Sequence, residues 1–459
     1  MSAARVMRPD RRQLRWDMVD LEGLLPADHR ARVVWSFVES LDLSELYERV
    51  KSRDGAAGRP AADPAVLLSL WLYATVEGVG SARELERLAE SDAAYRWLAG
   101  GVPVNHHGLA DFRVESVEAL DRLLTQSVTA LIGEGLISLD EIAVDGTKIR
   151  ASASKESFKT GEKLLKVEAA VAERLASLRQ ELSSDPGASS RRGRAARERA
   201  ARDVQARAER ARAALERLEA ERKARAKTHA KDEAKKREPR ASTSDPEARC
   251  MRFPDGAVRP AFNAQIAAAP IEGVIVSIAV TDRRNDAGLA RPMVDDIARR
   301  YGKTPDRLLV DTSYATSEDI VALADHVAGP VSVFTPPPSD RDNVKLASLA
   351  RRIRKRDKEP VRLKAWRERM ASEAGQAVYA LRQRIERIHA DRKNHGFGFL
   401  AVRGLVKAKA HALWHALAKQ PHGRPTPEGQ RLAPASCGTE RLPKTTILPP
   451  KDSPMKPPE

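Results

Sequence analysis

The chain has 459 residues with 80 Lys and Arg against 64 Asp and Glu, a formal net charge of +16. Its two cysteines, Cys250 and Cys437, exclude a disulfide-stabilised scaffold, and no apolar run approaches the ~20 residues that a bilayer requires. The basic N-terminus lacks an apolar signal core, so we expect a cytoplasmic, nucleoid-associated protein with no membrane segment. The excess of positive charge predicts a polyanionic partner, most simply nucleic acid.

Residues 1–135 are predicted to be helical. Asp63 is a good N-cap for an apolar helix with Pro64 at its first position, and Gly78 ends it. Further helices are expected to begin at Ser81, Asn105 and Ser116. Short helices with tight turns in a basic chain fit a DNA-binding helix-turn-helix, and they equally fit a plain helical bundle.

Strand character begins at residue 139. Short β-branched runs bounded by Gly, Pro, Asp or Asn predict strands over 139–145, 271–280, 307–311 and 331–336. Helical patterns follow the second run and the third. Strands that alternate with helices indicate an α/β layer with partly parallel pairing.

A charged helical segment separates the first strand from the others. Apolar residues recur at spacings of three or four from Leu164 to Leu182, and the loop signal SSDPGASS follows. A second helical run then holds 19 Lys and Arg against 9 Asp and Glu over residues 191–240. We predict a long antiparallel helical hairpin over 159–238. Its basic run is either a DNA contact or a solvated face.

The last residues have a different composition. Ten of the 41 residues from 419 to 459 are proline, and no periodicity survives. We expect this tail to be disordered.

Two aspartates follow apolar strands. Asp145 ends the run Ile142-Ala-Val and Asp311 ends Leu308-Leu-Val. Carboxylates at the carboxyl ends of strands face the crevice where α/β sheets bind ligands. A turn-forming Asp-Gly explains Asp145 as well, and a helix cap explains Asp311. Two such residues in one sheet favour the shared crevice.

A third carboxylate lies on a predicted helix over residues 373–393. Tyr379, Arg382, Glu386 and Lys393 fall within a sector of roughly 60° at ~100° per residue, beside an apolar stripe. Glu386 is then at the edge of the buried face rather than in solvent. The aspartates at 282, 286 and 319 compete more weakly, because none combines a strand end with a motif.

Two aspartates and a glutamate at one sheet edge suit hard divalent cations. Mg²⁺ prefers oxygen ligands and keeps waters and substrate phosphates. Two such ions, ~3.5–4 Å apart, activate the attacking oxygen and stabilise the leaving oxygen of a phosphodiester. The pattern therefore predicts two Mg²⁺ (or Mn²⁺) ions per site and in-line phosphoryl transfer.

The spacing Tyr379-x2-Arg382-x3-Glu386-x6-Lys393 resembles the signature of DDE transposases from bacterial insertion sequences. The segments around Asp145 and Asp311 are similar to the first- and second-aspartate segments of that family, with Ser313 where glycine is usual. Residues 72–86 and the Asp-Phe-Arg at 111–113 resemble its InsH-like N-terminal domain. The resemblance covers about residues 10–418.

This resemblance implies an α/β fold with an RNase H-like mixed sheet, flanking helices, an all-α N-terminal domain and the hairpin as an insertion. The implied division is a DNA-binding domain over 1–135, a catalytic domain over 136–158 and 239–418, and the tail. Asp145, Asp311 and Glu386 would be catalytic and would hold the metals. The implied DNA-binding residues are Tyr379, Arg382, Lys393, Lys148 and Arg113.

The implied function is that of an insertion-sequence transposase. It would bind the terminal inverted repeats of its element, cut them in a metal-dependent reaction and join them to target DNA, acting as a dimer on DNA. One alternative is a catalytically decayed copy that only binds DNA, which the unusual tail favours and the intact carboxylate trio opposes. The others are a nuclease of the same fold that cuts without joining, and a helical scaffold protein.

Overall fold

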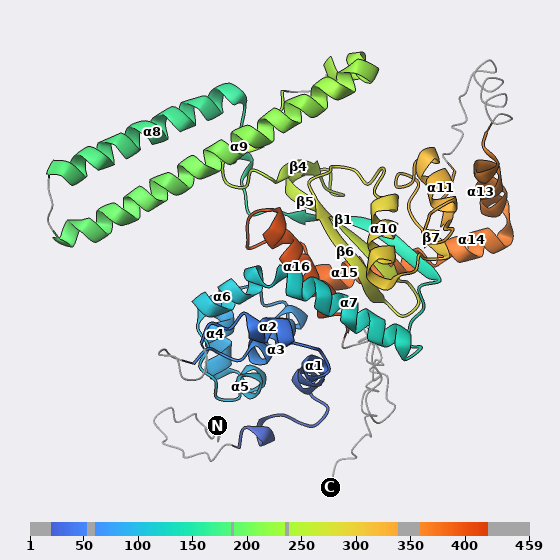
Figure 1. Ribbon diagram of the computed structural model, residues 1–459, viewed down its shortest axis with the longest axis horizontal. Coiled ribbons are helices and arrows are strands. Elements are labelled where there is room, and N and C mark those ends of the chain that lie inside the picture. Colours follow the sequence, from blue (N-terminus) through green and yellow to red (C-terminus); the bar gives the residue numbers. More distant parts are fainter. Residues whose placement is uncertain (1–19, 53–59, 185–187, 235–237, 338–358, 421–459) are drawn as a thin grey trace, which may run out of the picture.

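The computed structural model describes residues 20–52, 60–184, 188–234, 238–337 and 359–420. Within these residues the chain forms a mixed sheet with helices packed around it, a group of N-terminal helices on one side, and a long helical pair that projects away from the sheet (Figure 1). The arrangement is the RNase H-like fold with the all-α N-terminal region that the sequence predicts.

The N-terminal helices begin where their capping residues stand. The Asp63 carboxylate accepts a hydrogen bond from the Ala65 N–H at 2.8 Å, and the Asn105 side chain accepts one from the Gly108 N–H at 2.8 Å. The apolar helix after Asp63 is buried on nearly every side, because the other helices surround it. These elements are η1 (Glu22–Leu24), α1 (Arg30–Glu39), α2 (Ser44–Glu48), α3 (Pro64–Val76), α4 (Ala82–Ser91), α5 (Ala93–Ala99), α6 (His106–Glu115) and α7 (Val117–Gly133).

The main sheet has β1 at its centre. The strand β5 pairs antiparallel with β1 on one side and with β6 and β4 on the other. On the far side, β7 pairs parallel with β1 and β8 parallel with β7. The strands are β1 (Glu141–Arg150), β4 (Arg249–Arg252), β5 (Val258–Ala269), β6 (Val274–Thr281), β7 (Arg307–Leu309) and β8 (Ser332–Phe334).

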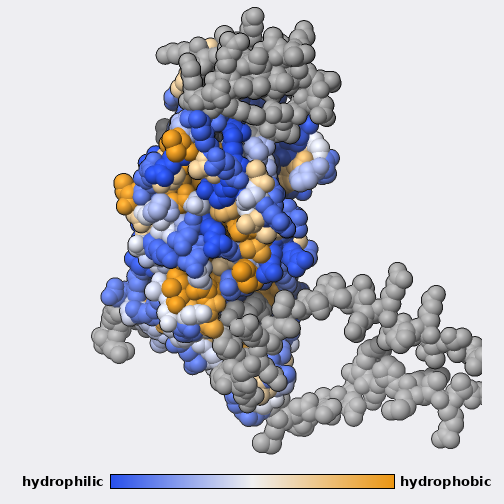
Figure 2. All heavy atoms as spheres, turned by 90° about the vertical axis from the view of Figure 1, so that its right-hand side faces the viewer, coloured by the Kyte–Doolittle hydropathy of each residue, from blue (hydrophilic) through white to orange (hydrophobic). Residues whose placement is uncertain are grey.

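The remaining helices cover this sheet and its edge. Helix α10 covers β6, α11 and α13 lie beside β8, and α15 packs on β1. They are α10 (Ala290–Tyr301), α11 (Ser317–Ala324), α13 (Val361–Ala371), α14 (Glu373–Ala380), α15 (Gln383–Asn394) and α16 (Leu405–Leu417). On the side of α11, α13 and α14, hydrophilic side chains surround separate apolar patches (Figure 2).

Three sequence predictions about these elements were wrong. The first strand does not end at Asp145 but continues to Arg150, because β5 pairs with it along its whole second half. Residues 258–269 form β5, although no strand was predicted there. The single helix expected over 373–393 is two helices, because the N–H groups of Leu381 and Arg382 bond to carbonyls three residues back and make a tight 3₁₀-like turn.

The helical hairpin is formed by α8 (Gly161–Ser184) and α9 (Ala188–Ala234). A two-stranded sheet of β2 (Phe158–Lys159) and β3 (Ala241–Ser242), next to η2 (Lys155–Ser157), brings its two ends together. Leu164 packs on Leu215 at the base of the pair. Since α9 is about twice as long as α8, its C-terminal part continues past this base without α8 beside it (Figure 1).

One hydrophobic core joins the N-terminal helices to the sheet. Helix α16 makes the connection, since it packs on α3 and α7 on one side and on β6 on the other. The core extends past residue 418, where we placed the start of the tail: Gln420 is fully buried and donates to the Ile275 carbonyl at 2.9 Å. The rest of the predicted tail, 421–459, lies outside the described residues. Of the helices that are described, none has the length and apolar character needed to cross a membrane.

Candidate active site

The two strand-end aspartates meet through the register of β1 and β7. This parallel pair runs from Glu141 opposite Arg307 to Ala143 opposite Leu309. The paired residues end two positions before both aspartates, and the same offset would bring Asp145 level with Asp311, whose charge is close enough to raise the pKa of Asp145. In a parallel pair such residues lie side by side. Two carboxylates from segments 166 positions apart in sequence are therefore neighbours at the carboxyl end of β7.

Asp145 is the more buried of the two. Its side chain is 17% exposed, and its Oδ1 accepts a hydrogen bond from the Gly146 N–H at 3.0 Å. Burial raises the pKa of Asp145 to about 6; Arg382 opposes the rise, and the charges of Asp286 and Asp311 add to it. A carboxyl that is costly to ionise becomes a strong ligand once a cation balances its charge.

Arg382 links Asp145 to Glu386. Its guanidinium lies 3.3 Å from Asp145 Oδ1 and 3.6 Å from Glu386 Oε1. The turn before α15 sets this geometry, since Arg382 stands at the N-cap of the helix and Glu386 in its first turn. The Glu386 side chain is 65% exposed, so it reaches the crevice from the solvent side.

The other residues of the signature lie around this pair. Tyr379 is in the last turn of α14, and burial raises the pKa of its hydroxyl; Arg382 opposes the rise, and the three site carboxylates add to it. Lys393 is in the last turn of α15, and burial lowers the pKa of its ammonium, with nearby Lys148 adding to the lowering. All four signature residues therefore lie near Asp145, and Lys148, three residues after it in β1, lies close to Lys393.

Asp145, Asp311 and Glu386 have the oxygen donors that Mg²⁺ and Mn²⁺ prefer. In the part of the chain that the structure describes, however, no three His, Cys, Asp or Glu side chains are arranged as a metal site. The positive charge of Arg382 stands between two of the three carboxylates, Asp145 and Glu386. The donor chemistry fits a divalent cation, which would have to take over the balancing role of this guanidinium.

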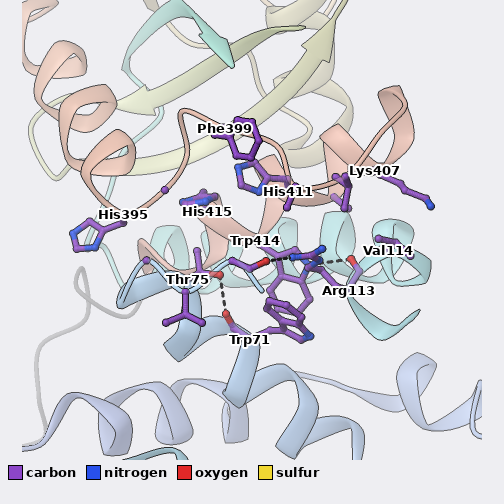
Figure 3. A pocket seen from close by; sticks show the side chains of 17 residues that line it. Trp71, Thr75, Arg113, Val114, His395, Phe399, Lys407, His411, Trp414 and His415 are labelled. Atoms are coloured by element: carbon purple, nitrogen blue, oxygen red, sulfur yellow. Dashed lines mark hydrogen bonds between the residues drawn. The ribbon is translucent and has the colours of Figure 1, made fainter. Parts of the chain in front are cut away.

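Arg113, predicted to bind DNA, lies elsewhere. It lines a cavity of about 270 Å³ between α3, α6, α16 and the segment after α15 (Figure 3). Its guanidinium stacks on Trp71 at 4.7 Å and donates to the Gly80 carbonyl at 2.6 Å. Burial lowers its pKa. These contacts join the N-terminal helices to α16, whose Trp414 donates to the Arg113 carbonyl at 3.1 Å.

His389 belongs to the site and was missed in the sequence. Its Nδ1 lies 3.7 Å from Asp145 Oδ2, and burial lowers its pKa to about 3, with Lys393 and Arg382 adding to the effect. The ring is therefore neutral at physiological pH. The signal was present, because His389 continues the spacing of Arg382 and Glu386 on one face of α15.

The aspartates at 282, 286 and 319 were the weaker candidates for the site, and two of them have hydrogen-bond partners elsewhere. Asp319 completes a capping box with Thr316 at the start of α11. Asp282 accepts from Arg217 of α9 at 2.6 Å and from Arg249 of β4 at 3.0 Å, which ties the base of the hairpin to the sheet. Asp286 lies close enough to Asp145 to affect its pKa.

Two family models match the chain. The transposase DDE domain matches residues 227–419, which include Asp311 and Glu386, and the transposase domain DUF772 matches residues 19–115. Asp145 precedes the first match, because the hairpin separates it from the rest of the catalytic sheet. No curated protein and no solved structure matches the chain. Together the two models cover more than half of the sequence, one on the RNase H-like sheet and one on the N-terminal helices, and the chain belongs to the DDE transposases of the insertion-sequence type.

Proposed function

We propose that this transposase binds the ends of its own element and catalyses metal-dependent DNA strand cleavage followed by strand transfer. The observation that supports the proposal is the parallel register of β1 and β7, whose last pair, Ala143 and Leu309, lies two residues before Asp145 and Asp311. The contact of Arg382 with both Asp145 and Glu386 adds the third carboxylate.

Each side chain has a role in this proposal. Asp145, Asp311 and Glu386 would hold two divalent cations, which would supply Lewis acidity for cleavage of the phosphodiester. Arg382 balances the carboxylates before metal binds and afterwards contacts a DNA phosphate. Lys393, Lys148 and Tyr379 line the path of the DNA backbone. Neutral His389 of α15 packs beside the Asp145 carboxylate and limits its movement.

DNA recognition is assigned to the N-terminal helices, with help from the basic α9. Such binding weakens steeply with salt, because Lys and Arg contacts release counterions from the DNA. The protein is proposed to act as a dimer, since each element has two ends to be joined. The assignment of Arg113 to DNA binding is the weakest part, because its guanidinium is engaged by Trp71 and Gly80.

The test is nicking of a labelled element end with Mg²⁺ or Mn²⁺. Changing Asp145, Asp311 or Glu386 to Ala is expected to lower the rate roughly 10³-fold or more, while binding of end DNA stays within a fewfold. Arg382→Ala and Lys393→Ala should cost less, since neither residue is a metal ligand. Asp319→Asn, which removes a carboxylate from the α11 cap, is the matched control.

Unchanged nicking by Glu386→Ala would contradict the proposed trio. Products in which the cut end is joined to a second DNA would separate a transposase from a nuclease of the same fold. A wild-type protein that binds ends without cutting them under any metal would support the decayed alternative instead.

A further inference from the structure

A fixed carboxylate lies behind Asp145, on the other face of β1. Asp286 follows β6, and its Oδ1 accepts hydrogen bonds from Asn263 Nδ2 at 2.7 Å and from Gln265 Nε2 at 2.8 Å. Both amides come from β5 and are 1% exposed. A buried amide is costly unless it is bonded, so these two donors hold the carboxylate in place.

The carboxylate occupies the space that Gly146 leaves free. A Cβ on Gly146 would lie 2.8 Å from Asp286 Cγ and 2.9 Å from Gln265 Nε2, which is closer than such atoms approach. Gly146 directly follows Asp145 in β1 and donates its N–H to that carboxylate. Because successive residues of a strand face opposite sides, Asp286 contacts the backbone of β1 from behind the site.

The loop that carries Asp286 also holds the segment of the second aspartate. Gly288 donates its N–H to the Tyr314 carbonyl at 3.0 Å, and the Tyr314 N–H donates to the Asp311 carbonyl at 3.0 Å. The Tyr314 side chain is fully buried, so the turn is anchored in the core. One loop therefore touches the backbone next to both strand-end aspartates.

We infer that Asp286 is a positioning residue of the catalytic site, which fixes the segments of Asp145 and Asp311 from behind and whose negative charge strengthens the binding of a divalent cation in front of them. Asp286 is not itself a metal ligand in this assignment, since the sheet lies between its carboxylate and that of Asp145. The inference rests on the proposed function, because it gives Asp286 a part in the same site.

The electrostatics support the second half of this role. The Asp286 carboxylate fills the space at Gly146, the residue that follows Asp145 in β1, so its negative charge lies close to the proposed cation. A negative charge held at short range in a poorly solvated place favours a cation nearby, because their attraction is only weakly screened there. The two donors that hold Asp286 are the neutral amides of Asn263 and Gln265, which leave its charge in place.

The experiment measures Mn²⁺ binding by calorimetry and the Mn²⁺ concentration that gives half-maximal nicking of element ends. Asp286→Asn keeps the shape and an acceptor for both amides but removes the charge. We expect the half-saturating Mn²⁺ concentration to rise about five- to tenfold. Maximal nicking at saturating Mn²⁺ should be largely restored, and end binding should be unchanged. Asp295→Asn removes a charge from the exposed side of α10, where its partners are Arg291 and His326, and should change nothing.

Gly146→Ala tests the same contact without touching any acid. The added methyl group should displace the Asp286 carboxylate and weaken Mn²⁺ binding. Combined with Asp286→Ala, it should cost much less than the sum of the two single changes, because the carboxylate that it displaces is already gone.

Equal Mn²⁺ half-saturation for Asp286→Asn and wild type, with wild type active, would overturn the inference and leave the proposed function standing. Additive effects of the two alanine changes would do the same. A wild-type protein that neither binds Mn²⁺ nor nicks ends would contradict the proposed function and this inference together.

Discussion

Burial shifts ionisable groups in opposite directions in two regions of this transposase. At the sheet edge it raises the pKa of Asp145 to about 6. In the cavity between the N-terminal helices and α16 it lowers the pKa of His411 to about 4, and that of His415 well below its usual value. Both pKa shifts have the same cause: a poorly solvated environment disfavours the charged form of the group.

The two regions differ in what can offset the free-energy cost of a buried charge. The carboxylate group at the sheet edge includes the solvent-exposed Glu386, so a cation or a DNA phosphate contact from outside can balance the charges there. The two histidines pack against each other and against Phe397, and His411 Nε2 and His415 Nδ1 are buried without a hydrogen-bond partner. The first region is therefore prepared for a ligand, whereas the second stays intact only while its rings are neutral.

The largest expected effect on stability comes from the cavity. Trp414 is 2% exposed, packs near Trp71 and Phe112, and donates to the Arg113 carbonyl. Trp414→Ala should lower the free energy of unfolding by about 3–5 kcal/mol, measured by denaturant titration. Glu386→Ala at the exposed rim of the other region should cost less than about 0.5 kcal/mol. A similar loss of unfolding free energy in the two variants would show that the cavity and the site do not differ in their contribution to stability.

Asp145→Asn should stabilise the protein while it abolishes cleavage. The pKa of Asp145 is higher in the folded chain than in the unfolded one, so the folded state holds the proton more tightly between about pH 4 and 6. Stability is therefore lost as the pH rises through this window. The variant should gain about 2–3 kcal/mol at pH 7.5 and nothing near pH 4, by thermal melts without metal. A gain that did not depend on pH would show that ionisation is not its cause.

His415→Leu should make the fold less sensitive to acid. The pKa of His415 is lowered in the folded chain, so the unfolded state takes up the proton first, and stability is lost as the pH falls below about 6.5. At pH 5 one such histidine costs about 2 kcal/mol relative to pH 7.5. The variant should avoid this loss. His395→Leu is the control, because that ring is partly exposed at the cavity wall.

The smallest expected effect separates two possible roles of Arg113, a structural link between helices and a contact to a DNA phosphate. Arg113→Lys keeps the charge but weakens the stack on Trp71, and should cost about 0.5–1 kcal/mol of stability. If Arg113 only joins the helices, Arg113→Ala should leave the salt dependence of DNA binding unchanged. If it neutralises a phosphate, the slope of log affinity against log salt should fall by about one. Lys393→Ala, at the site, provides the comparison.

The candidate site was predictable wherever its signal is local. Asp145 and Asp311 each follow an apolar run, and Glu386 lies in a helical stripe with Arg382 and Lys393. The strand β5 was missed because its sequence, rich in alanine with Asn263 and Gln265, has little β propensity. Pairing with β1 on one side and with β4 and β6 on the other overrides that preference. Because the strand was not predicted, the role of its two amides in holding Asp286 was not predicted either.

The sequence by itself determined the family and most of the helices and strands, and it singled out three candidate carboxylates, because apolar periodicity and motif spacing are local properties. Only the tertiary structure decided the register that sets Asp145 beside Asp311, the break before α15 that turns Arg382 toward both acids, and the place of Asp286 behind Gly146. It also merged the N-terminal helices and the sheet into one core through α16. These features depend on contacts between residues far apart in the chain, and such contacts form only when the whole apolar surface is buried together.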